Sequence, residues 1–148
     1  MRSKVFNTPF ENMLRILLLA DTVNKPMNVD RFVALDFICI FGEKCRVLDK
    51  NLHGDNEFGF SEFATKRERI AEAVKIAVKN DFLTVKATDA GFTYGMNNRG
   101  KAIVSGVQSP YAHSYIVGAK IVNSRFARYT DDEILQYISD LSSEAEEG

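Results

Sequence analysis

The sequence predicts a mostly helical α+β fold with a winged helix-turn-helix core, a β-hairpin wing and extra C-terminal helices. The segment 60–95 carries this prediction, because its apolar spacing changes from helical to alternating. The helical part has apolar residues at Ile70, Ala73, Val74, Ala77 and Val78. The alternating part has them at Leu83, Val85 and Ala87, and again at Phe92 and Tyr94 after the turn at 89–91. An amphipathic helix that leads directly into a short hairpin is typical of a winged-helix unit.

Length and composition indicate one globular domain. The chain has 148 residues, of which 45% are hydrophobic and 26% charged, which is ordinary for a protein with a single core. We expect one domain over 1–148, with a winged-helix core over about 7–96, a helical extension over about 97–142 and an acidic tail over 143–148.

Two helices are expected before the central segment. Asn7 or Thr8 is a suitable N-cap and Pro9 suits a first helical turn, so the first helix should run from there to about Val23. Asp30 is the expected cap of a second helix over 31–41. Both helices are apolar on nearly all sides, which predicts that they are central or covered by a partner.

The remaining elements follow from breaks and caps. Residues 42–59 have no period, and a loop of this length is often functional or mobile. A short helix is expected over 97–107, and a further helix carries an apolar stripe at Tyr111, Tyr115, Ala119, Val122 and Phe126. Thr130 and Glu133 form a capping box for a last helix, which we expect to fray after Ser142.

Charge is unevenly distributed although the net charge is −1. Residues 131–148 contain seven acidic residues and no basic one, so the rest of the chain has 19 basic and 13 acidic residues. This excludes a strongly basic nucleic-acid binder. No apolar run is long enough to span a membrane and the N-terminus does not resemble a signal peptide, so a cytoplasmic protein with reduced Cys39 and Cys45 is expected.

No residue pattern supports catalysis, a metal or a cofactor. The segment from Gly95 to Ala102 fits a phosphate-binding loop up to Lys101, but Ala102 lacks the hydroxyl that would hold Mg²⁺. The spacing of Cys39, Cys45 and His53 is unlike that of zinc ligands, and His113 is distant. No Ser or Cys is marked out as a nucleophile beside a His and an acid, so we predict no enzyme activity.

The expected recognition helix carries a small surplus of positive charge. Lys66, Arg67 and Arg69, with two lysines further along, outnumber its glutamates by two. Weak non-specific DNA contact is compatible with this surplus. Sequence-specific reading is disfavoured, because the helix offers no Asn or Gln before Asn80.

An interaction module is better supported than a DNA-binding one. The two apolar N-terminal helices and the pair Tyr111 and Tyr115 exceed what one small core obviously needs, and exposed apolar patches often mark partner surfaces. Packing of these residues against one another is the equally supported alternative.

Six short segments follow one another in an order that is typical of a known family. They are Phe6 to Glu11, Asp30 to Asp36, Leu52-His53, Thr88 to Gly91 before Tyr94, Ser109 to Ala112, and Arg125 to Ile134. On these segments the chain resembles the type 2 middle component of the ABC-three-component (Lamassu-like) conflict systems. The resemblance spans nearly the whole chain in order and departs at 42–59, and at Lys66 and Arg67, where a more arginine-rich stretch is expected.

The resemblance implies a non-catalytic adaptor in anti-phage or anti-plasmid defence. Its partners would be an SMC/Rad50-like ABC ATPase and an effector, often a nuclease. We expect Phe10, Tyr111 and Tyr115 to dock on a partner, and Lys66, Arg67 and Arg69 to contact a partner or DNA. The alternative is a winged-helix transcription regulator, with a homodimer as the expected state of the isolated protein. A small nucleotide-dependent enzyme is a third and disfavoured reading.

Overall fold

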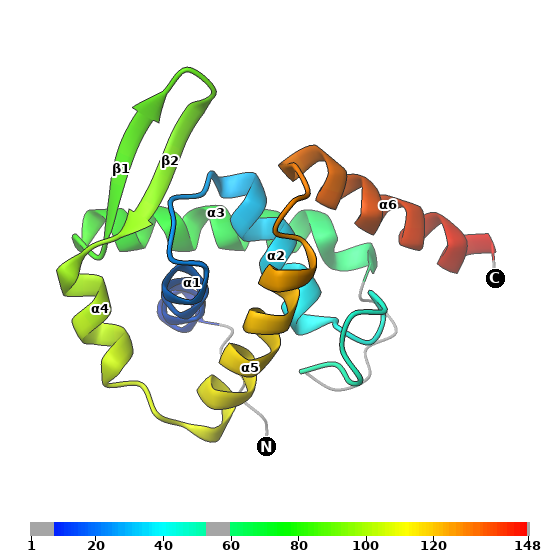
Figure 1. Cartoon of the computed structure of the whole chain (residues 1–148), viewed down its shortest axis with the longest axis horizontal. Helices are drawn as coiled ribbons and strands as arrows, with labels where there is room; N and C mark the ends of the chain where they lie inside the picture. Colours follow the sequence, from blue (N-terminus) through cyan, green and yellow to red (C-terminus); the bar gives the residue numbers. More distant parts are fainter. Residues whose placement is uncertain (1–7, 53–59, 148) are drawn as a thin grey trace.

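The computed structural model describes residues 8–52 and 60–147. Within them, the chain forms α1 (Pro9–Val23), α2 (Val29–Ile40), the 3-10 helix η1 (Phe60–Glu62) and α3 (Phe63–Lys79). The hairpin β1 (Leu83–Thr88) and β2 (Gly91–Met96) follows, and then α4 (Asn98–Ser105), α5 (Pro110–Arg125) and α6 (Asp131–Glu147). The predicted mostly helical α+β architecture with a hairpin is therefore confirmed (Figure 1). Asn7 and His53 lie outside the described residues.

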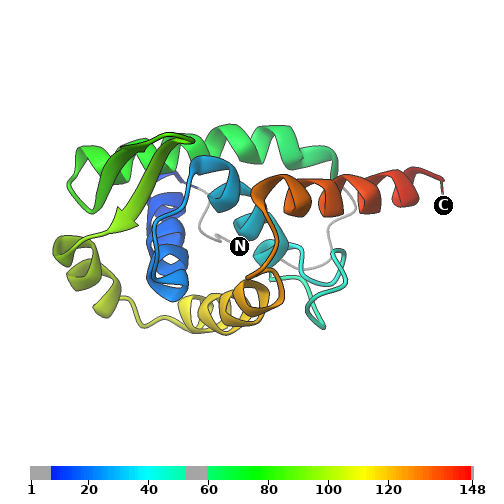
Figure 2. The same ribbon diagram turned by 45° about the horizontal axis from the view of Figure 1, so that its top comes forward.

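α1 and α2 form the centre of the molecule. α1 packs between α3 and α5 and also contacts α4, while α2 contacts α3, α5 and α6 (Figure 2). Every residue of α2 from Phe32 to Ile40 is buried, and so is most of α1. The apolar character of both helices is thus explained by packing within the chain, which is the internal alternative considered from the sequence.

Side-chain caps define the helix ends. Thr8 and Glu11 form a capping box at α1, and Thr130 and Glu133 form the predicted one before α6. The N-cap of α2 is Asn28, which accepts a hydrogen bond from the Arg31 N–H at 2.9 Å, and not Asp30. Asp30 lies in the first turn instead, where it pairs with Arg67. The expectation that Asp30 caps this helix was wrong because Asn28, two residues earlier, already has the extended backbone of a cap.

The hairpin is antiparallel and stands out from the helical body (Figure 1). Leu83 pairs with Met96, Val85 with Tyr94 and Thr88 with Gly91 across the register. Met27 forms a bridge with Tyr94 of β2, and the two nitrogen-to-oxygen distances are 3.0 and 2.8 Å. The connection between α1 and α2 thereby lies alongside β2.

The described part of the 41–59 connection is compactly folded. The Val47 and Leu48 N–H groups both donate to the Gly42 carbonyl, and the buried Asn51 side chain accepts from the N–H groups of Glu43 and Lys44. Residues 41–52 are therefore held as hydrogen-bonded turns against the helices.

α6 extends further than expected. The helix continues to Glu147, although fraying was predicted after Ser142. The Ser, Glu and Ala residues of this segment permit helix, and Arg46 of the turn region donates to Glu144 at 2.8 Å. Figure 1 shows α6 reaching away from the body towards the C-terminus.

Gly100 provides a test of the close packing between the hairpin base and α4. A Cβ at this position would collide with the Phe82 carbonyl oxygen and approach the Met96 sulfur to 2.9 Å. We expect Gly100→Ala to lower the free energy of unfolding by about 1–3 kcal/mol, as overpacking does. Gly106→Ala is the control, because its nearest neighbour would lie 3.6 Å away. Urea unfolding of both variants measures the effect, and equal stabilities would contradict this packing.

Candidate functional site

The three residues predicted to dock on a partner do not form one surface. Phe10 lies in the first turn of α1 and is 60% exposed. Tyr111 is half-buried at the start of α5, and Tyr115 is only 1% exposed. In this structure Tyr115 therefore offers no surface to a partner, and the docking role predicted for it is replaced by a role in the core.

Tyr115 belongs to a buried polar cluster with Arg15 and Asp36. The Arg15 Nε donates to Asp36 Oδ1 at 2.8 Å and its Nη2 donates to Oδ2 at 3.0 Å. The Tyr115 hydroxyl donates to the same Oδ1 at 2.7 Å. All three residues are 1% exposed and come from three helices, α1, α2 and α5. This arrangement joins the helices, because a buried charge is tolerated only when it is paired and hydrogen-bonded.

The electrostatics of the cluster favour a fixed protonation pattern. Burial would lower the pKa of Arg15, but the Asp36 carboxylate outweighs it and holds that pKa above its usual value. Burial and the Asp36 charge raise the pKa of Tyr115 well above its ordinary range. Burial also raises the pKa of Tyr111. Arg15 therefore stays charged and Tyr115 stays a hydrogen-bond donor at neutral pH, so the cluster is suited to structure and not to proton transfer.

Two of the three basic residues predicted for charged contacts are engaged inside the chain. Lys66 is largely buried, with its Nζ 3.9 Å from Glu62 and 5.8 Å from the centre of the Phe41 ring. Burial lowers the pKa of Lys66. Arg67 forms its ion pair with Asp30, whereas Arg69 is exposed and has no ion pair within the described ranges 8–52 and 60–147. Arg69 is consequently the member of this set that is most open to a partner.

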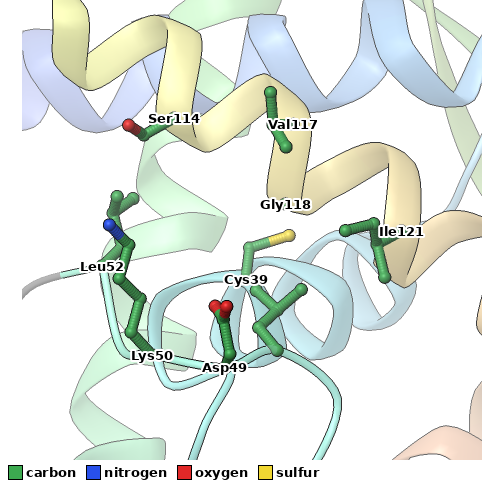
Figure 3. Close-up of a pocket in the computed structure, with 9 residues that line it drawn as sticks. Cys39, Asp49, Lys50, Leu52, Ser114, Val117, Gly118 and Ile121 are labelled. Atoms are coloured by element: carbon green, nitrogen blue, oxygen red, sulfur yellow. The ribbon is translucent and has the colours of Figure 1, made fainter.

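A small pocket opens beside the thiol of Cys39. It lies between α5 and residues 48–52 and has a volume of about 100 Å³ (Figure 3). Gly118 of α5 faces Leu48 across it, and a Cβ on that glycine would lie 3.2 Å from the leucine side chain. Ligand pockets usually measure roughly 300–1,000 Å³. This pocket is therefore a packing gap and not a substrate site.

The two thiols are predicted to be unreactive in the folded protein. Both cysteines are buried, and burial raises the pKa of Cys39 well above its usual value and that of Cys45 to about 12. We expect native protein to react with a thiol reagent at pH 8 at least 100-fold more slowly than protein in denaturant. The rate of thiol labelling, measured for native and for denatured protein, checks this prediction. Fast labelling of either cysteine in the native state would contradict the buried placement.

The same shifts predict loss of stability at alkaline pH. A thiol whose pKa is raised by folding keeps its proton in the native state while the unfolded chain loses it. The contribution of Cys45 to the free energy of unfolding should then be constant below about pH 8.5, the ordinary cysteine value, and fall between there and its native pKa, about 12. Urea titrations of the wild type and of Cys45→Ala at pH 7, 9 and 10 measure this contribution as their difference, and a wild type that gains stability relative to the variant over that range would contradict it.

The segment that imitates a phosphate-binding loop does not form one. Gly95 lies in β2, the second strand of an antiparallel hairpin, and Gly100 lies in α4, which begins after the Asn97 cap.

The described residues contain no group of three His, Cys, Asp or Glu side chains placed to hold a metal ion. They also contain no helix long and apolar enough to cross a membrane.

The spatial arrangement brings together two segments that carry the sequence resemblance. Arg31 of α2 donates to the carbonyl oxygens of Phe126 at 2.9 Å and Tyr129 at 2.8 Å, and to Asp131 at 3.0 Å.

The family model of the ABC-three component (ABC-3C) system Middle Component 2 matches residues 5–147, which include every helix and strand described above. The chain belongs to this family. No curated protein and no solved structure matches it significantly.

The residues that sequence reasoning missed in this Middle Component 2 protein are Arg15 and Asp36. Each is the one charged residue among the buried residues of its helix. A charge on the covered side of such a helix indicates a buried partner of opposite sign, and this signal was present in the sequence. Which residue would pair with which depended on the packing of α1 against α2.

Proposed function

We propose that this chain is a non-catalytic adaptor that links an SMC/Rad50-like ABC ATPase to an effector subunit, often a nuclease, in a Lamassu-like anti-phage or anti-plasmid defence complex. The observation that carries the proposal is the match to the Middle Component 2 family over residues 5–147. A component of a multi-subunit system needs surfaces for its partners more than it needs an active site.

The use of the reactive side chains supports a non-catalytic role. The buried acid Asp36 is bound by Arg15 and Tyr115, and both thiols are buried with raised pKa values. Of the predicted docking residues, Phe10 is exposed and fits apolar docking, and Tyr111 is half-buried. Arg69 is the best placed of the predicted charged contacts. Lys66 and Arg67 would have to leave their internal partners to bind another molecule.

A winged-helix core is part of the proposal. The order α1, the Met27 bridge, α2, α3 and hairpin supports it, since the isolated bridge places the backbone of Met27 beside β2. The 41–59 connection between α2 and α3 is longer than the tight turn of a helix-turn-helix.

The second candidate function, a winged-helix DNA-binding regulator, is favoured by Lys75 and Lys79 on α3 beside the hairpin.

Co-expression with the proteins encoded by the two neighbouring genes tests the adaptor function. Size-exclusion chromatography with light scattering gives the composition of any complex. We expect co-elution with a long coiled-coil ATPase. Elution alone as a dimer that shifts a short DNA duplex at physiological salt would favour the regulator, and elution alone without a shift would remove both functions.

A further inference from the structure

The hairpin has one apolar face whose outer half is uncovered. Residues that alternate along a strand share a face, and the register places the apolar residues of both strands on the same one. These residues are Leu83, Val85, Ala87, Phe92, Tyr94 and Met96. Leu83 at the base is 1% exposed, whereas Val85 is 43% and Phe92 60% exposed. The core covers the base of this face and leaves its outer part open, where the hairpin stands out from the body (Figure 1).

The open face and the C-terminal half of α3 border an open groove of about 390 Å³, here named the α3–hairpin groove. Its volume lies within the range of roughly 300–1,000 Å³ that is usual for ligand sites. It is lined by Lys75, Val78, Lys79, Val85, Phe92 and Tyr94. The floor is apolar, and the α3 side carries two ammonium groups without any carboxylate among the lining residues.

The two lysines lack the internal partners that other basic residues have. Lys66, Arg67 and Lys101 each lie within 4.0 Å of a carboxylate. Lys75 and Lys79 are exposed and form no such pair in the part of the chain that the structure describes. A complementary occupant must therefore bring negative charge to the lysines and apolar side chains to the floor.

This chemistry argues against two other occupants. The acidic α6 of a second copy has the charge, but its apolar residues Ile134, Ile138 and Leu141 are already buried in its own core. DNA would satisfy the lysines through its phosphates, but it would leave Val85 and Phe92 without apolar contacts.

We propose that the α3–hairpin groove binds an acidic segment with apolar anchor side chains in a protein partner of the complex. This inference rests on the proposed adaptor function and names the chemistry of one of its contacts. Apolar anchors in the segment cover Val85 and Phe92, and its carboxylates pair with Lys75 and Lys79 at the rim, an arrangement typical of a specific protein interface.

A photo-crosslinker in the full chain tests the groove. p-Benzoylphenylalanine replaces Phe92, and the protein is co-expressed with the products of the two neighbouring genes. The matched control carries the crosslinker at Val117 of α5, which is also exposed, at 47%. We expect a crosslink from position 92 to one partner segment that contains several acidic residues, identified by mass spectrometry. The paired variant K75E/K79E should reduce its yield at least 10-fold.

Substitution at the floor provides the second measurement. Phe92→Ser should weaken the complex at least 10-fold and leave the melting temperature nearly unchanged, because the side chain is mostly exposed. Val117→Ser should leave the complex intact. Two results would overturn the groove proposal and leave the adaptor function standing. One is a stable complex without a crosslink from position 92, and the other is a crosslink to a basic segment, to DNA or to a second copy. Wild-type protein that elutes without partners would overturn the adaptor function and this contact with it.

Discussion

Replacing Asp36 with alanine is expected to destabilise the fold by about 3–5 kcal/mol, the cost of breaking a buried ion pair. The substitution leaves the Arg15 guanidinium buried without its carboxylate, and it removes the acceptor of the Tyr115 hydroxyl. Because domains of this kind are stable by only about 5–15 kcal/mol, a large part of the stability should be lost. Urea unfolding monitored by circular dichroism measures the change.

Two control variants separate the charge from the packing. Tyr115→Phe keeps the pair between Arg15 and Asp36 and removes one hydrogen bond to a charged group, so it should cost roughly 1.5–3 kcal/mol. The double variant R15M/D36L replaces the pair by apolar side chains, so it should recover the part of the loss that comes from the unpaired Arg15 charge but not the part that comes from the Tyr115 hydroxyl. A single Asp36→Ala variant as stable as the wild type would contradict the role assigned to the cluster.

Replacing Arg31 with alanine is expected to release α6 from the body. This side chain joins α2 to the carbonyl oxygens of Phe126 and Tyr129 and to Asp131, and it is 11% exposed. α6 packs chiefly on α2, so these bonds hold the start of the helix in place. We expect a loss of about 2–4 kcal/mol, from several hydrogen bonds to a charged group. Hydrogen exchange should show the largest increase over 131–147.

Arg46→Ala is the matched control for this prediction. Arg46 also contacts α6 through a single ion pair with Glu144, but the two side chains are 66% and 55% exposed. Such surface pairs contribute about 0–1 kcal/mol. Exchange over α6 should therefore stay near that of the wild type in this variant. Equal protection of α6 in Arg31→Ala and wild-type protein would show that the Arg31 contacts do not anchor the helix.

The helices and the hairpin could be predicted because their signals are local. Apolar spacing, caps and breaks predicted a first helix that ends at about Val23, as α1 does, and the alternation from Leu83 to Tyr94 predicted the hairpin. The start of α2 was misplaced because Asn28 and Asp30 are both suitable caps and lie two residues apart. The end of α6 was placed too early because acidic residues favour solvent without preventing a helix.

The site residues were harder to predict because they depend on which side of a helix meets the core. The stripe from Tyr111 to Phe126 was correctly recognised as one face of a helix, but Tyr115, Ala119 and Val122 on it are buried. The periodicity predicts which residues of the helix share a face, but it does not predict which other helices cover that face. Similarly, Arg15 and Asp36 are 21 residues apart, and Tyr115 lies 79 residues beyond Asp36, so only the packing of three helices joins them.

The most direct test of the proposed adaptor function is whether this chain connects the ATPase and the effector that are proposed as its partners. A tagged effector is used to retrieve the ATPase from cells that express both proteins, with and without the middle component. The proposal predicts retrieval of the ATPase only when this chain is present, and loss of that retrieval when the chain is left out. Equal retrieval in its absence would contradict the linking role, because the two partners would then bind each other without it.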